Sequence, residues 1–273
     1  MTSSGRTRSQ TEPMHGAAPV AEVGDSAFRR LRLANLALVV AHLGQAALIL
    51  ALANGFTIGV TGSFATGPPG TPPGEPSTLF ELAIAPAIAA FLALAALDHL
   101  LVALPGFADR YRRGLSEGRN LFRWSEYSLS ASLMIVLIAM LTGITDVGAL
   151  VAIFGVNAAM ILFGWLVETT GVPGRNVNWT AFGFGCVAGA VPWIAITIAL
   201  VGAEQDGEVP TFVYGIFVSL FVLFNSFAVN MALQQGRVGR WRNYLFGEAG
   251  YLVLSLVAKS ALAWQIFAGT LAD

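Results

Sequence analysis

Long apolar runs alternate with short polar segments along most of the chain. Seven of these runs reach or exceed about 18 residues, the length at which a helix crosses a bilayer. They cover, to within a few residues, 31–53, 79–104, 121–142, 147–169, 178–201, 210–234 and 244–270. The pattern predicts an all-α integral membrane protein, a bundle of seven transmembrane helices.

Two polar segments frame the first apolar run. Residues 1–27 are polar or small and have no apolar core, so they do not form a signal peptide, and we expect a disordered cytoplasmic tail. The folded domain is expected to cover residues 28–273. A long extracellular loop at about residues 54–78 is rich in Gly, Pro, Thr and Ser. Its alternating front half can form a short hairpin, whereas its proline-rich back half cannot.

The composition agrees with a membrane protein. Of the 273 residues, 55% are hydrophobic and 11% are charged, whereas soluble domains have about 25% charged residues. A net charge of -1 gives no indication of a nucleic-acid partner, so the expected surroundings are the lipid bilayer. Cys186 is the single cysteine, which excludes a disulfide within the chain.

The arginines lie on one side of the predicted bundle. They precede or begin the first run, lie between or at the ends of the second and third runs, or lie between the fourth and fifth and the sixth and seventh runs. The loops on the other side carry acids, namely Glu75, Asp146, Glu204, Asp206 and Glu208. By the positive-inside rule, this multi-pass cell-membrane protein has a cytoplasmic N-terminus and an extracellular C-terminus.

Lys259, the only lysine, lies near the middle of the seventh run. A charge at that depth costs at least about 2.5–3.5 kcal/mol and marks a functional site. Asp98, Glu168 and Glu248 lie near the ends of their runs. Glu126 lies a turn or two inside the third run and is the most plausible partner of Lys259.

Other polar residues gather in the same half of the bundle. Arg123 precedes Glu126 by three residues and Ser255 precedes Lys259 by four, so each shares a helix face with its neighbour. His42 and His99 fall at a similar depth. Residues 134–139, beyond Glu126, include no titratable group. We therefore expect no vectorial proton transport.

A lysine in the middle of the seventh helix and a carboxylate on the third resemble the pattern of retinal-binding rhodopsins. More narrowly, RWSEYSLSASLMIVLIAMLTGI, from Arg123 to Ile144, is similar to the third helix of the heliorhodopsins. The inverted orientation, the long first extracellular loop and Ser255 also match that family. The resemblance covers roughly residues 28–270.

The resemblance implies roles for individual residues. Lys259 would bind retinal, all-trans in the dark, as a protonated Schiff base, and Glu126 would be its counterion. Ala95 stands where the resemblance implies a serine. No metal site is expected, and a homodimer is implied. The Schiff-base surroundings and cytoplasmic cavity would include Ser255, His42, His99 and Arg123, and the chromophore pocket Tyr127, Ser130, Asn157, Ile161, Gly164 and Phe224.

The leading interpretation is a light sensor that is not an enzyme, does not pump ions and signals to an unknown cytoplasmic partner. Two alternatives stay open. One is a light-gated proton conductor, and the other is a non-photoactive transporter in which Lys259 and Glu126 form the coupling site.

Overall fold

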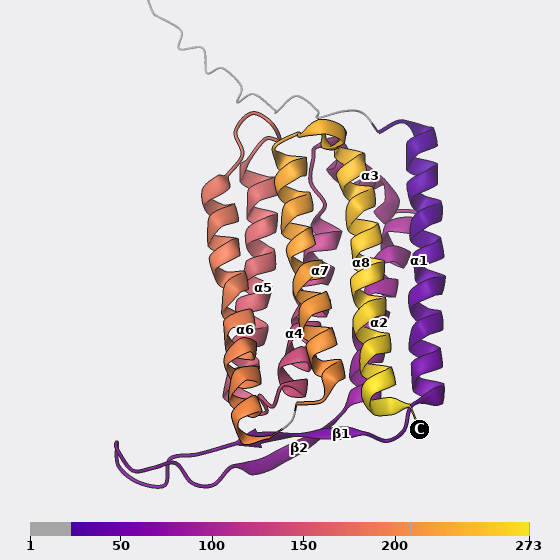
Figure 1. Cartoon of the computed structure of the whole chain (residues 1–273). Coiled ribbons are helices and arrows are strands. Elements are labelled where there is room, and N and C mark those ends of the chain that lie inside the picture. Colours follow the sequence, from indigo (N-terminus) through magenta and orange to yellow (C-terminus); the bar gives the residue numbers. More distant parts are fainter. Residues whose placement is uncertain (1–22, 208, 273) are drawn as a thin grey trace, which may run out of the picture.

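The computed structural model describes residues 23–207 and 209–272. Within these ranges, seven helices are long and apolar enough to cross a membrane, and they stand side by side as one bundle (Figure 1). This confirms the predicted seven-helix membrane architecture. The seven are α1 (Asp25–Leu52), α2 (Ile84–Ala103), α4 (Leu121–Leu141), α5 (Val147–Thr170), α6 (Trp179–Asp206), α7 (Thr211–Gln235) and α8 (Tyr244–Ile266).

Several helices begin at a polar residue that caps them. Asn120, Asp146, Asn178 and Asn243 each accept a hydrogen bond from a backbone N–H in the first turn of α4, α5, α6 and α8. These caps satisfy donors that a helix cannot satisfy internally. The helix starts therefore follow from the sequence.

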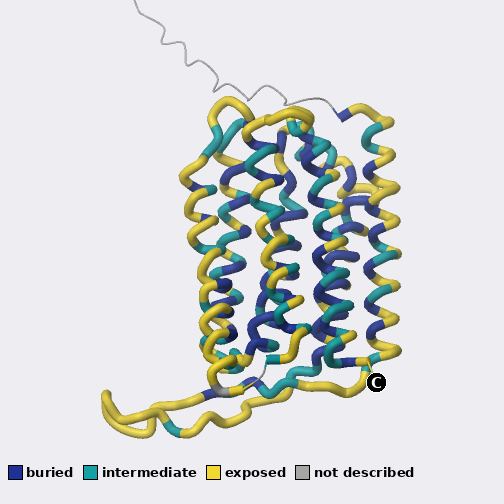
Figure 2. The backbone as a smooth tube through the Cα atoms, in the orientation of Figure 1, coloured by how far each residue is buried: buried dark blue, intermediate teal, exposed yellow. Residues whose placement is uncertain are grey.

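Helix α4 lies at the centre of the packing. It contacts α2 and α5 most extensively and also packs against α6 and α7, while α1 pairs with α2 and α8 pairs with α7. The backbone is buried mainly on the inward faces, and the outward faces are exposed (Figure 2). An apolar outward face is what a lipid environment requires.

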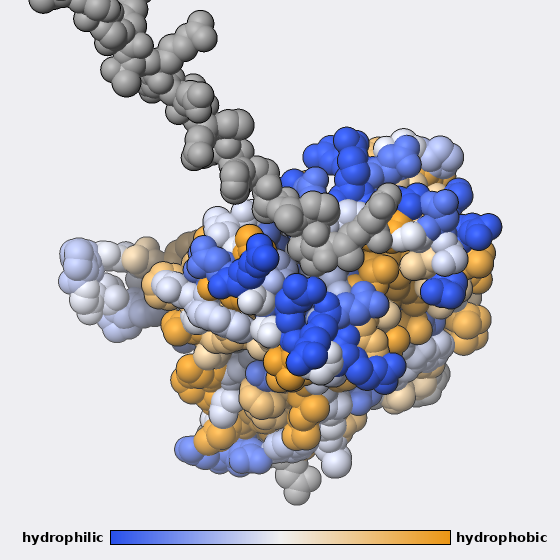
Figure 3. All heavy atoms as spheres, turned by 90° about the horizontal axis from the view of Figure 1, so that it is seen from above, coloured by the Kyte–Doolittle hydropathy of each residue, from blue (hydrophilic) through white to orange (hydrophobic). Residues whose placement is uncertain are grey.

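The two ends of the bundle differ in charge. All arginines among the described residues lie at the end where α1, α4, α6 and α8 begin, here called the arginine end. Seen from that side, hydrophilic residues form several groups across the face of the bundle (Figure 3). The opposite end carries Glu75, Glu81, Asp146 and Glu204 and is called the acidic end.

The loop between α1 and α2 forms a two-stranded antiparallel sheet across the acidic end (Figure 1). Strand β1 (Thr57–Gly62) falls where a hairpin strand was predicted, but its partner β2 (Ser77–Ala83) lies beyond the proline-rich segment. The predicted second span was therefore wrong over residues 79–83, which are strand. The backbone N–H of Thr61 donates to Thr145 O at 2.9 Å and ties the sheet to the turn before α5.

The predicted boundary of the tail was also wrong. Residues 1–22 of that tail lie outside the described residues, but α1 already begins at Asp25. Val23 is buried beside Tyr111 and Leu115, and its carbonyl accepts hydrogen bonds from Arg112. The folded domain therefore includes residues 23–27.

Three short elements were not predicted. Helix α3 (Phe107–Ser116) lies across the arginine end and buries Ala108, Tyr111 and Leu115. A 3-10 turn, η1 (Gly239–Arg242), precedes α8, and a π-helical turn, η2 (Phe267–Leu271), follows it. α3 and η1 are too short and too polar to show as apolar runs, whereas η2 falls mostly within the predicted seventh run.

Candidate functional site

Lys259 forms a buried ion pair with Glu126 inside the bundle. The Nζ atom lies 3.3 Å from Glu126 Oε1, and it donates to Ser255 Oγ at 2.8 Å. Both charged side chains are almost completely buried. Side chains on a helix lean toward its N-terminus, so the Lys259 amine lies over Ser255, one turn earlier on α8. An unpaired ammonium here would be far more costly than this pair.

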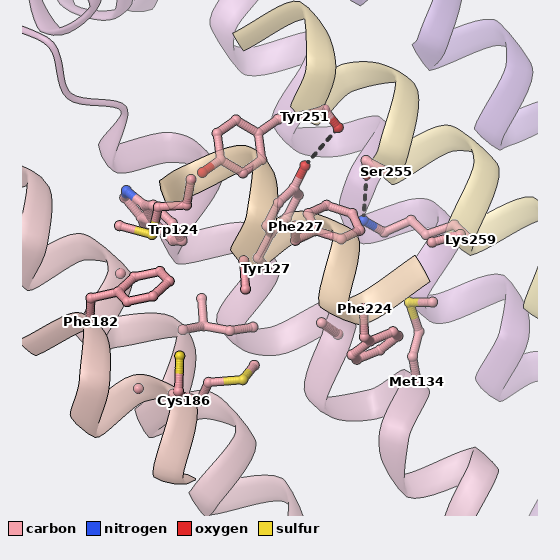
Figure 4. Close-up of a pocket in the computed structure, with 18 residues that line it drawn as sticks. Trp124, Tyr127, Met134, Phe182, Cys186, Phe224, Phe227, Tyr251, Ser255 and Lys259 are labelled. Carbon is pink, nitrogen blue, oxygen red and sulfur yellow. Dashed lines mark hydrogen bonds between the residues drawn. The ribbon is translucent and has the colours of Figure 1, made fainter. Parts of the chain in front are cut away.

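The amine also faces a large apolar cavity. The cavity has an empty volume of about 860 Å³, which includes its open mouth. Aromatic and methionine side chains form its walls, and Lys259 and Ser255 lie at one edge (Figure 4). Tyr127 borders the amine, with its ring centroid 4.8 Å from Nζ, and its hydroxyl donates to Tyr251 O at 3.1 Å.

Four of the six residues predicted for the chromophore pocket line this cavity: Tyr127, Ile161, Gly164 and Phe224. Ser130 and Asn157 do not. The lining positions on α4 are residues 124, 127, 131 and 134, a spacing that defines one helix face. Ser130 is buried on another face, and Asn157 donates to Ser132 Oγ at 3.1 Å.

Sequence reasoning missed most of the cavity wall. Helical spacing from Tyr127 would have indicated Trp124, Ala131 and Met134. The same spacing from Gly164, Phe224 and Ser255 would have indicated further lining residues on α5, α7 and α8, namely Met160, Phe227, Ala228, Met231, Tyr251 and Ala258. No such signal marked Phe182, Gly185 and Cys186, because no site residue was predicted on α6.

Arg123, predicted for the Schiff-base surroundings and the cytoplasmic cavity, forms its ion pairs with carboxylates other than Glu126. Its guanidinium contacts Glu168 at 2.5 Å and also pairs with Glu248. It stacks on Tyr251, 3.9 Å from the ring centroid. Asn120 donates to both carboxylates, from its backbone to Glu168 and from its side chain to Glu248. This group of five residues is called the Arg123 cluster, and it joins α4, α5 and α8.

The two histidines predicted for the polar cavity lie next to each other. The rings of His42 and His99 are stacked, with centroids 5.6 Å apart and planes 4° apart. His99 Nδ1 lies 2.8 Å from Asn35 Oδ1, whereas neither ring nitrogen of His42 has a partner among the described residues. A small cavity bordered by Asp98, His99 and Arg123 connects this pair to the Arg123 cluster.

An apolar block fills the bundle between Lys259 and the acidic end. It is the largest cluster of buried hydrophobic residues and includes Ile88, Phe91, Ile135, Ile138 and Leu262. Beyond Tyr127, α4 has no titratable side chain that could hold a proton.

Solved structures with this fold are microbial rhodopsins. The light-driven proton pump LR (Mac) from Leptosphaeria maculans has a TM-score of 0.62 and 16% identity, covering 90% of this chain and 95% of its own. Exiguobacterium sibiricum rhodopsin has a TM-score of 0.60 and 12% identity, covering 88% and 95%. Thermophilic rhodopsin from Rubrobacter xylanophilus has a TM-score of 0.55 and 18% identity, covering 88% and 94%. At these identities the likeness shows the fold.

A comparison with curated protein sequences finds no match. Seven membrane-length helices enclose a buried lysine beside an apolar cavity, and their fold is the one found in rhodopsins. A model of the heliorhodopsin family matches residues 31–271, nearly the whole chain. The chain belongs to the heliorhodopsin family, which confirms the resemblance in its third helix.

Proposed function

We propose that this protein is a light sensor that binds retinal covalently through Lys259 and signals without transporting ions. The observation that carries the proposal is the Lys259–Glu126 pair at the edge of an apolar cavity. A transporter's coupling site would not need the adjoining aromatic cavity. The family membership supports a photoreceptor over a transporter.

The residues around the cavity fit retinal. Its aldehyde would condense with the Lys259 amine, releasing water, and the bound chromophore would supply visible-light absorption and photoisomerisation. The apolar walls suit a polyene chain. Gly164 keeps the cavity open, because a Cβ there would approach the Trp124 ring to 2.5 Å.

The side chains near Lys259 control the charge on its nitrogen. Glu126 supplies the negative charge that keeps a proton on that nitrogen in a low-dielectric interior. Ser255 orients the nitrogen by hydrogen bonding. His42, without a partner among the described residues and stacked on His99, can accept a proton within the same polar region.

The absence of net transport is supported by the apolar block. Within the described residues, the spans carry histidines and carboxylates on the arginine side of the Lys259 nitrogen, whereas on its acidic side they hold neither until the helix ends. Illuminated cells that contain the protein and retinal should therefore show no uncoupler-sensitive pH change. A photocurrent that reverses with voltage would instead establish the light-gated conductor.

The proposed orientation places the arginine end in the cytoplasm. In a Cys186→Ala background, a cysteine at Gly207 should react with an impermeant reagent added outside intact cells. A cysteine at Val238, on the arginine end, should react only after lysis. The reverse labelling would refute the inverted orientation without affecting the retinal site.

The direct test of the function is colour. The purified protein should form a visible pigment with all-trans retinal, and borohydride should fix the chromophore to the peptide containing residue 259. Lys259→Ala should insert in the membrane and stay colourless. A pigment in Lys259→Ala would overturn the proposal.

The proposed output is an interaction with a cytoplasmic signalling partner, made by a homodimer. Partner capture in light and in darkness tests the first part, and the mass of the detergent-solubilised pigment tests the second. Capture that is identical in light and darkness would argue against a light-dependent partner.

A further inference from the structure

A second large hollow lies at the arginine end, away from the Lys259 site. It opens between α3, the turn that follows α3, and the ends of α4 and α5, with an empty volume of about 1120 Å³ including its open mouth. Arg110, Arg113 and Arg119 border it together with Phe122 and Trp165. The hollow is thus charged on one side and aromatic on the other.

The charges in the hollow do not balance. Glu117 is the one carboxylate among the lining residues, and it pairs with Arg119. Within the described residues, neither Arg110 nor Arg113 forms a salt bridge. Three arginines and one glutamate leave a formal charge of +2. A concave surface with free guanidinium groups is suited to a phosphate oxyanion.

The fold of α3 holds these arginines in place. Tyr111 and Leu115 are buried against the bundle, which leaves Arg110 and Arg113 exposed on the face of α3 that is turned away from the core. The packing of α3 therefore does not need their charge. Both guanidinium groups are therefore free to bind a ligand in the hollow.

The α5 wall of the hollow continues along an exposed apolar stripe of that helix. Trp165 and Thr169 border the hollow from α5. Leu162 and Leu166 lie on the same stripe of that helix and are more than 40% exposed. A tryptophan at the end of a spanning helix is typical of the headgroup level of a bilayer. Leu166 lies beside Trp165 and Leu162 lies about one turn deeper in the membrane, so the two leucines provide a path for an acyl chain.

We propose that this hollow binds the phosphate group of an anionic phospholipid. Arg110, Arg113 and Arg119 would contact the phosphate, Trp165 would lie at the glycerol level, and an acyl chain would follow the leucine stripe of α5. A soluble phosphate could use the arginines but would gain nothing from Trp165 or the stripe. That difference separates the two sources of the same oxyanion.

The proposal can be tested with the retinal-loaded, detergent-solubilised protein. Native mass spectrometry would follow binding of dioctanoyl phosphatidylglycerol, with dioctanoyl phosphatidylcholine and glycerol phosphate as comparison ligands. We expect one phosphatidylglycerol per chain, bound more tightly than either comparison ligand. An arginine near the membrane surface contributes about 1 kcal/mol, or about fivefold in affinity. The double variant Arg110→Gln/Arg113→Gln should therefore bind about 25-fold more weakly.

The matched control is Arg29→Gln/Arg30→Gln, which removes the same charge from exposed positions on α1. It should bind phosphatidylglycerol like the wild type, and both variants should keep the visible band as evidence of folding. Equal loss in both variants would show a general surface-charge effect and overturn the site. Glycerol phosphate binding as tightly as phosphatidylglycerol would overturn the lipid assignment. No saturable binding by the wild type would overturn both.

Discussion

Replacing Glu126 by glutamine removes the anion beside the Lys259 nitrogen while preserving the size of the side chain. The two charges are separated by 3.3 Å. At an effective dielectric constant of about 20, this distance corresponds to an attraction of about 5 kcal/mol. This energy changes the equilibrium constant for protonation of the nitrogen by a factor of between about 1,000 and 10,000. In the Glu126→Gln pigment, the protonated Schiff base should therefore be strongly depopulated at neutral pH.

The assay is an absorption spectrum recorded across a pH titration. The wild type should show one red-shifting transition on acidification, as Glu126 accepts a proton and its negative charge is lost. Glu126→Gln should lack this transition, and its visible band should be weak at neutral pH and red-shifted wherever the nitrogen is protonated. Glu204→Gln, at the acidic end, is a control of the same chemistry and should titrate like the wild type.

One result would refute the reasoning. If Glu126→Gln kept the wild-type spectrum and titration while Asp98→Asn lost them, the counterion would be Asp98, which borders the neighbouring small cavity. Glu248→Gln is less informative for this purpose, because Glu248 is already paired with Arg123.

Two further predictions concern stability and the shape of the cavity. Arg123→Gln should destabilise the protein by about 3–5 kcal/mol, because two buried carboxylates lose their cation. Its thermal unfolding midpoint should fall clearly, whereas the midpoint of the exposed control Arg175→Gln should not. Equal midpoints for the two variants would contradict a buried Arg123 cluster. Gly164→Ala should push the Trp124 ring from its place, since a Cβ would lie 2.5 Å from it, and should shift the absorption band and slow pigment regeneration. Gly183→Ala, in open space on α6, is the matched control, and identical spectra for both variants would show that the Trp124 ring does not shape the site.

The spanning helices could be predicted because lipid leaves the backbone few choices. Every N–H and C=O in the hydrocarbon must be satisfied within the chain, so a long apolar run becomes a helix. The error at residues 79–83 has a non-local cause. Leu79, Phe80 and Leu82 are as apolar as a span, and only pairing with β1 makes them a strand.

The Lys259–Glu126 pair could be predicted because charged residues inside the spans are so few. The position of Arg123 could not be derived from its spacing alone. Arg123 leans toward the start of α4, as helical side chains do, and there it meets carboxylates from the end of α5 and the start of α8. Which helix ends lie together depends on the tertiary packing and cannot be read from the spacing within one helix. The same holds for Phe182 and Cys186, whose place in the cavity depends on the rotation of α6.

The surroundings of Lys259 differ in kind on its two sides, and this difference bears on how light could produce a signal. Toward the acidic end, the apolar block offers no group that holds a proton or an ion. Toward the arginine end, the small cavity leads to the Arg123 cluster, which ties α4 and α5 to α8. Glu248 precedes Lys259 by eleven residues on α8, or about three helical turns. Under the proposed function, a change of charge at Lys259 and Glu126 acts on this cluster through the cavity and along α8, because the block opposes any other polar route. The output is then a rearrangement of helix ends at the arginine end, where a cytoplasmic partner could bind, and not an ion crossing the membrane.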